Sequence, residues 1–151
     1  MLGGFHCGSL YFHGGVGIGH ELNTKVLNGT AIRVKALQGP FVLAADWNCT
    51  PKELAATGFL ALIGGSVVHP VNKTCTAGKG RILDYFVVSL SMLPYVRVAF
   101  NVEDAATSPH SPVRLIFGAK PRKDAVRMLK VPKSHPRCYR TGLTVVSSMT
   151  R

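Results

Sequence analysis

Residues 41–45 read Phe-Val-Leu-Ala-Ala, an apolar run that follows Gly39-Pro40 and ends at Asp46. A strand with one face in water alternates apolar and polar residues, whereas a continuous apolar run of this length is typical of a strand buried on both faces. A sheet that contains such a strand must be covered by another layer on each side. The run therefore predicts a central strand in a layered fold.

Other strand and helix signals surround this run. Five further strands are expected in segments rich in β-branched, aromatic or small residues: 5–12, 67–68, 82–89, 95–101 and 113–117. The spacing of apolar residues predicts a helix over residues 22–37, with Asn28-Gly29 as an interruption. Because strands outnumber helices and each helix separates strands, the order of elements favours an α/β or α+β sandwich.

A second helix has an unusually specific start signal. Thr50 offers a capping hydroxyl, Pro51 follows at the first helical position, and Glu53 stands three residues after the threonine. This is the pattern of a capping box, in which the missing N–H of proline costs nothing. We expect the helix to stop near Gly64-Gly65.

The 151 residues carry a formal net charge of +11, and the charge is unevenly distributed. Residues 119–151 hold nine Lys and Arg and only one acidic residue, Asp124. We expect residues 1–118 to form the folded part and residues 119–151 a basic, proline-containing and poorly ordered tail. Such a tail favours nucleic acid, an acidic membrane surface or an acidic protein as partner. The alternative interpretation is a solvated tail that has no dedicated partner.

Several function classes are disfavoured. The strongest apolar stretch, residues 59–68, is shorter than the ~20 residues that cross a bilayer. The beginning of the chain does not resemble a signal peptide, so an intracellular protein, in nucleus or cytoplasm, is expected. The four cysteines form no C-x-x-C pair and are predicted to be free thiols. The glycines of residues 14–19 do not match a dinucleotide-binding fingerprint.

Polar residues at the end of the central strand are candidates for chemistry. Asp46 and Asn48 are two residues apart, so in an extended chain both side chains would lie on one side, where they could bind a cation or a phosphate-linked water. The open alternative is an aspartate that forms a turn.

Three more candidates lie elsewhere in the chain. Asp84 stands in an apolar strand and needs a partner there, since an isolated buried carboxylate is costly. His110 lies between Pro109 and Pro112, and a hydrogen bond from it to Asp84 would set its tautomer. Tyr11 ends the first strand, where core or edge packing is the alternative to a ligand contact.

The order of these motifs resembles the C-terminal half of the endonuclease/exonuclease/phosphatase family, which includes apurinic/apyrimidinic endonucleases and non-LTR retrotransposon endonucleases. The resemblance covers about residues 5–118. It rests on four segments in family order: 9–12 (Ser-Leu-Tyr-Phe), 45–48 (Ala-Asp-Trp-Asn), 81–85 (Arg-Ile-Leu-Asp-Tyr) and 108–113 (Ser-Pro-His-Ser-Pro-Val).

The resemblance implies a four-layer α/β sandwich, present here in part, with a mostly antiparallel mixed sheet and flanking helices. It also implies hydrolysis of a phosphodiester or phosphomonoester with Mg²⁺ or Mn²⁺. The basic balance and the Leu-Asp-Tyr-Phe motif of residues 83–86 favour nucleic acid over inositol phosphates as substrate. By this likeness Asp46 would activate water, Asn48 would hold that water or a phosphate oxygen, and His110 would bind the scissile phosphate. Asp84 would orient His110, and Tyr11 would contact the phosphate region.

Two departures from the family pattern keep other interpretations open. Pro109 stands where the family has an aspartate, and no segment before Tyr11 supplies the family's metal-binding glutamate, so that Asp46 and Asn48 are the nearest metal-ligand candidates. The chain is therefore interpreted as a truncated hydrolase domain whose missing half or a protein partner would cover an exposed sheet. The alternatives are a non-catalytic relic that binds nucleic acid or protein, and a structural subunit.

Overall fold

The computed structural model describes residues 4–118. The predicted tail at residues 119–151 and Cys138 lie outside the described residues, and the division of the chain at residue 118 stays a prediction. The elements are β1 (His6–Tyr11), α1 (Glu21–Leu37), β2 (Phe41–Asp46), α2 (Pro51–Ala56), α3 (Phe59–Ile63), β3 (Gly65–Val68), β4 (Asp84–Ser89), the 3-10 helix η1 (Leu90–Tyr95), β5 (Val96–Asn101) and β6 (Val113–Phe117).

Four strands form a mixed sheet in the order β1-β2-β4-β3. β1 and β2 are parallel, and the two other pairs of neighbours are antiparallel. β5 and β6 form a separate antiparallel pair. The expected α/β class with a mostly antiparallel mixed sheet and flanking helices is therefore confirmed.

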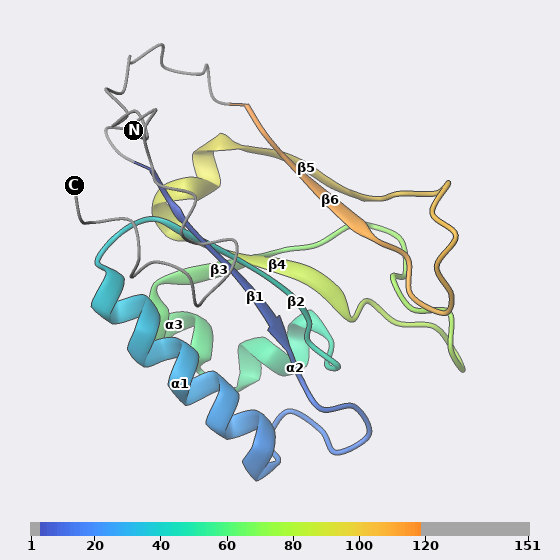
Figure 1. The fold of residues 1–151 in the computed structure, drawn as a ribbon, viewed down its shortest axis with the longest axis horizontal. Helices are drawn as coiled ribbons and strands as arrows, with labels where there is room; N and C mark the ends of the chain where they lie inside the picture. The colour runs from blue at the N-terminus through green and yellow to red at the C-terminus, as the bar shows by residue number, and fades with distance from the viewer. Residues whose placement is uncertain (1–3, 119–151) are drawn as a thin grey trace, which may run out of the picture. The chain divides into compact units, whose positions relative to one another are not determined.

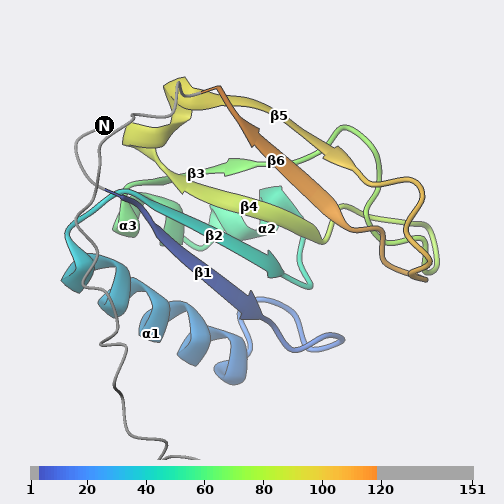
Figure 2. The same ribbon diagram turned by 45° about the horizontal axis from the view of Figure 1, so that its top comes forward.

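The four-stranded sheet is covered on both faces (Figures 1 and 2). The three α-helices lie on one face, and η1 and the β5–β6 pair lie on the other. Val42 in β2 and Val88 in β4 pack under Met92 of η1 and the inward side chains of β5 and β6. These contacts explain why β2 begins with three consecutive buried residues, as the apolar run predicted.

Aromatic stacking fills the core on the helical face. The ring of Trp47 is fully buried between those of Phe12 and Tyr85, with centroid distances of 5.0 and 5.4 Å. The indole N–H of Trp47 donates to the carbonyl oxygen of Tyr85 at 3.0 Å, so its polar group is satisfied in the interior. This stack packs the ends of β1 and β2 against the start of β4.

The first helix differs in detail from its prediction. α1 continues through Asn28-Gly29 without a break. Of the apolar residues that suggested the helix, Leu27 and Val34 are buried, whereas Leu22 and Ile32 are exposed. The core face of α1 includes the polar Asn23, whose side chain bonds to the backbone of residues 13 and 17 and ties the glycine-rich loop to the helix.

The capping box is confirmed, but the helix that it starts is shorter than expected. The Thr50 hydroxyl accepts from the N–H of Glu53, and the Glu53 carboxylate accepts from the N–H of Thr50. α2 ends at Ala56, and α3 begins after Gly58, whose φ of 76° is accessible mainly to glycine. Two short helices therefore stand where one was expected.

Two remaining expectations concern the described part of the chain. Cys7, Cys49 and Cys75 are free thiols, as predicted. Among residues 4–118, no helix has the length and apolar character needed to cross a bilayer. On the outer side of β5 and β6, the side chains of Val98, Phe100 and Ile116 remain partly exposed.

Candidate functional site

Three of the candidate residues form one row across the sheet. Tyr11 in β1 is in register with Asp46 in β2, and Asp46 is in register with Asp84 in β4. Paired residues on neighbouring strands project from the same face of a sheet. The strand pairing therefore brings together side chains that lie 35 and 38 residues apart in the sequence, on the face opposite the helices.

The fourth candidate reaches this row from the loop between β5 and β6. His110 Nδ1 lies 2.8 Å from Asp84 Oδ2. An ionised carboxylate has no proton to give, so Nδ1 donates and Asp84 accepts. The contact leaves Nε2 of His110 available for another partner. The hydrogen bond between His110 and Asp84 is the one that the sequence analysis expected.

Asp46, Asp84 and His110 each offer a ligand atom within 4.8 Å of the others. They lie beside a shallow hollow of about 250 Å³, whose lining includes Asp46, Asp84, Ala44 and Phe86. Burial is the largest influence on the Asp46 carboxyl and raises its pKa, and the nearby Asp84 carboxylate acts in the same direction. The N–H of Asn48 opposes this increase.

This donor set fits a divalent metal ion. Hard divalent cations prefer carboxylate oxygens and often use only one or two of them, with water and substrate completing the shell. Asp84 engages His110 through Oδ2 alone, so its other oxygen remains for a ligand, and Asp46 contributes a second carboxylate. Because the Asp84 carboxylate raises the pKa of the Asp46 carboxyl, a cation between the two would offset this repulsion.

Asn48 departs from the expected geometry. β2 ends at Asp46, and Asn48 has a left-handed φ of 48°, so the alternation of an extended chain does not apply to it. Its N–H donates to Asp46 Oδ1 at 3.1 Å, which makes the turn that was the alternative interpretation of this aspartate. Its side-chain amide donates to the Phe12 carbonyl at 2.7 Å, joining the loops after β1 and β2.

Tyr11 and Pro109, which lie in the first and the last of the four sequence motifs, have different surroundings. The Tyr11 side chain is 67% exposed, so it does not pack in the core. The Pro109 carbonyl accepts from the N–H and the hydroxyl of Thr76, at 2.9 and 3.1 Å, and this fixes the loop that carries His110. The catalytic roles of all these residues stay predictions.

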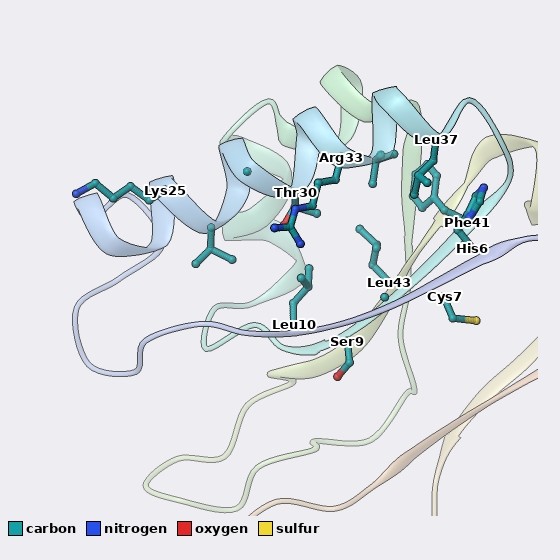
Figure 3. Close-up of a pocket in the computed structure, with 14 residues that line it drawn as sticks. His6, Cys7, Ser9, Leu10, Lys25, Thr30, Arg33, Leu37, Phe41 and Leu43 are labelled. Atoms are coloured by element: carbon teal, nitrogen blue, oxygen red, sulfur yellow. The ribbon is translucent and has the colours of Figure 1, made fainter. Parts of the chain in front are cut away.

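A larger hollow, of about 460 Å³, lies on the helical side between α1 and β1. Figure 3 shows Arg33 of α1 and Leu10 of β1 directed toward this hollow, whereas Cys7 and Ser9 point to the other side of the strand. None of its lining residues is acidic. The candidate chemistry therefore lies in the shallower hollow on the opposite face.

Comparison with solved structures identifies the fold. The chain resembles the cytolethal distending toxin from Actinobacillus actinomycetemcomitans with a TM-score of 0.55 and 17% identity, over 74% of this chain and 49% of that one. It resembles a 3'-5' exonuclease from Neisseria meningitidis with a TM-score of 0.53 and 16% identity, over 72% of this chain and 60% of that one. A Neisseria 3' phosphatase bound to a product DNA hairpin matches with a TM-score of 0.52 and 16% identity, over the same shares.

These structures have the DNase I-like fold of endonucleases, exonucleases and phosphatases, and this chain shares that fold. The fold named from the sequence motifs is therefore confirmed. The chain spans about half to three fifths of the length of these solved structures. No protein-family model and no curated protein matches the sequence.

Proposed function

We propose that this chain carries part of the active site of a metal-dependent phosphodiester hydrolase that acts on nucleic acid. The main support is the cluster of Asp46, Asp84 and His110 within 4.8 Å, in a fold shared with nucleases and phosphatases. The intracellular location expected from the sequence belongs to the same proposal.

Each residue has a chemical task in this proposal. With a proton on both ring nitrogens, His110 would donate a hydrogen bond from Nε2 to the scissile phosphate, where negative charge grows in the transition state. Asp84 holds the ring through Nδ1. Asp46, in the middle of the row, would accept a proton from the attacking water. Tyr11, exposed on the same row, would contact the phosphate.

Mg²⁺ or Mn²⁺ is the proposed cofactor, held by the oxygens of Asp46 and Asp84. When bound, the ion would polarise a phosphoryl oxygen and offset its charge. Asn48 supports this site through its backbone, since its N–H orients one oxygen of Asp46. The amide nitrogen of its side chain is bonded to Phe12, so the amide oxygen remains for a water or phosphate contact.

The proposed hydrolase domain would be completed by residues that this chain does not supply. The chain spans about half to three fifths of the solved structures that it matches, and side chains of the β5–β6 pair are partly exposed. A missing half or a protein partner would cover that surface. The basic residues of 119–151 would add attraction for the phosphate backbone.

The test compares the full chain with His110→Ala. With Mg²⁺ or Mn²⁺ present, and with the N-terminal half of a DNase I-like domain supplied as a separate chain, we expect nicking of supercoiled plasmid or of an abasic-site duplex, and a loss of about 10²–10³-fold in rate for His110→Ala. His6→Ala is the matched control, because His6 lies at the other end of β1 from Tyr11 and should leave the rate unchanged.

Metal binding is measured in parallel by NMR, from the broadening of Asp46 and Asp84 amide signals as Mn²⁺ is added. A folded chain that neither cleaves DNA nor shows this local broadening contradicts the proposal. Binding of DNA that is independent of metal and survives in His110→Ala would instead support the non-catalytic relic.

A further inference from the structure

Thr74, in the loop between β3 and β4, is a residue that no sequence motif singled out. Its side chain is fully buried. Its hydroxyl oxygen accepts two backbone hydrogen bonds, from the N–H of Leu83 at 2.8 Å and from the N–H of Asp84 at 2.9 Å. Two adjacent amides at the start of β4 therefore depend on one side-chain oxygen.

The same residue also holds the loop that carries His110. The Thr74 carbonyl accepts from the N–H of Ser111 at 2.7 Å. On the other side of the histidine, Thr76 donates twice to the Pro109 carbonyl. Figures 1 and 2 both show the loop before β4 beside the loop before β6, so two segments that are distant in sequence meet here.

We propose that Thr74 is a positioning residue that sets the contact between Asp84 and His110. Its hydroxyl fixes the backbone of Asp84 and its carbonyl fixes the neighbour of His110, so one residue controls both ends of the 2.8 Å hydrogen bond. This inference rests on the proposed function for its catalytic meaning, but the geometry on which it depends is measurable without any activity.

The chemistry requires an acceptor at this position. Valine has almost the shape of threonine but no oxygen, so Thr74→Val would leave the N–H groups of Leu83 and Asp84 without a partner. Serine retains the oxygen and loses only a methyl group. The pair of variants therefore separates the hydrogen-bonding role of Thr74 from its packing.

The decisive measurement is the imidazole ¹⁵N spectrum of His110, assigned by its disappearance in His110→Gln. In the wild-type chain and in Thr74→Ser we expect the signature of a proton held on Nδ1. In Thr74→Val we expect the Nδ1 and Nε2 signals to move toward the average of the two tautomers. Unchanged His110 signals in a folded Thr74→Val chain would overturn the proposal, as would an equal change in Thr74→Ser.

Thr30→Val is the matched control. Thr30 is also buried, on α1, and its side chain makes no hydrogen bond with another described residue. Thr30→Val should leave the His110 signals at their wild-type positions. If Thr74→Val does not fold, hydrogen exchange of the wild-type chain decides: the amides of Leu83, Asp84 and Ser111 must be protected, and exchange as fast as in the exposed Gly15 would overturn the proposal.

A rate measurement then connects Thr74 to catalysis. If the chain cleaves DNA, Thr74→Val should lower kcat by about 10-fold with little change in KM, because the loss concerns orientation of a reacting group. If the chain cleaves nothing while Thr74→Val still moves the His110 signals, the positioning role stands and only the hydrolase proposal fails.

Discussion

Asp46 combines burial with a neighbouring carboxylate, and the two effects have the same sign. Burial and Asp84 raise the pKa of the Asp46 carboxyl above its ordinary value. The folded state therefore binds this proton more tightly than the unfolded state. The resulting stabilisation is fully present below the unfolded pKa and is lost as the pH rises through the folded pKa.

This sign predicts the behaviour of Asp46→Asn, which retains an oxygen that can accept the N–H of Asn48. In EDTA at about pH 7 the variant should unfold at higher urea than the wild type, because the desolvated charge is gone. We expect a gain below about 1 kcal/mol, since the side chain is only half-buried and water screens it. The difference should shrink as the pH falls through the raised pKa of the wild-type carboxyl.

Magnesium supplies the control for this experiment. The proposed metal site predicts that added Mg²⁺ raises the urea midpoint of the wild type and leaves that of Asp46→Asn unchanged, because only the wild type keeps both carboxylates. Equal responses to Mg²⁺ in the two proteins would place the ion elsewhere. A less stable Asp46→Asn in EDTA would contradict the direction of the pKa.

The sequence motifs predicted some contacts of the site residues and not others. The hydrogen bond between His110 and Asp84 was predicted from the two motifs and is present. The predicted orientation of the Asn48 side chain was wrong, because the prediction assumed an extended backbone, whereas Asn48 has a left-handed φ of 48°. Thr74 was missed, since a single threonine in a polar loop carries no signal until its neighbours in space are known.

At the scale of elements, the start of α2 is the most locally determined feature of the fold. Thr50 and Glu53 satisfy one another's backbone N–H groups within four residues. Thr50→Ala removes the capping oxygen and should lower the free energy of unfolding by about 1 kcal/mol. Urea denaturation followed by circular dichroism measures this loss.

The pH dependence of the cap is a second check on the same element. The N–H of Thr50 lowers the pKa of the Glu53 carboxyl below its ordinary value. Its contribution is therefore present above the unfolded pKa and is lost as the pH falls through the folded pKa. The stability difference between the wild type and Glu53→Gln should vanish in acid.

Glu103→Gln is the control for that comparison, because the Glu103 side chain makes no hydrogen bond or ion pair with another described residue. Glu103→Gln should leave the free energy of unfolding nearly unchanged both at neutral pH and in acid.

A Thr50→Ala chain as stable as the wild type would mean that the capping box of Thr50 and Glu53 contributes nothing beyond helix packing.

The other helices show why element boundaries were less predictable. The spacing of apolar residues located α1, but its core face was decided by packing, which buried Asn23 and left Ile32 exposed. The break between α2 and α3 depends on the left-handed conformation of Gly58, which a glycine permits but does not require.

For the molecule as a whole, charge is separated from the candidate site in the sequence. Residues 119–151 carry nine Lys and Arg, as many as the preceding 118 residues. If these cations contact phosphates, log K for duplex DNA should fall by about 0.9 per contact for each unit of log salt concentration.

Glutamine substitution tests which basic residues bind DNA in the intact chain. Replacing Lys120, Arg122, Lys123 and Arg127 should reduce the salt slope measured by fluorescence anisotropy. The control replaces four lysines of the folded part and changes the net charge equally: Lys25, Lys35, Lys52 and Lys79. An equal loss in both variants would indicate a response to net charge alone, which contradicts a dedicated role for residues 119–151.

The sequence by itself determined the elements whose signals are local. A continuous apolar run predicts a buried strand, a hydroxyl and a carboxylate three residues apart predict a helix start, and ordered motifs predicted the DNase I-like fold. Each of these signals depends on residues that are close along the chain, or on the order in which short motifs follow one another.

Only the tertiary structure decided how the site is assembled. The row of Tyr11, Asp46 and Asp84 exists because β1 and β4 both pair with β2 in one register. The position of His110 depends on Thr74, 36 residues earlier in the chain. Strand register and loop packing are contacts between distant segments, so they are set by the whole folded core and leave no periodic pattern in the sequence.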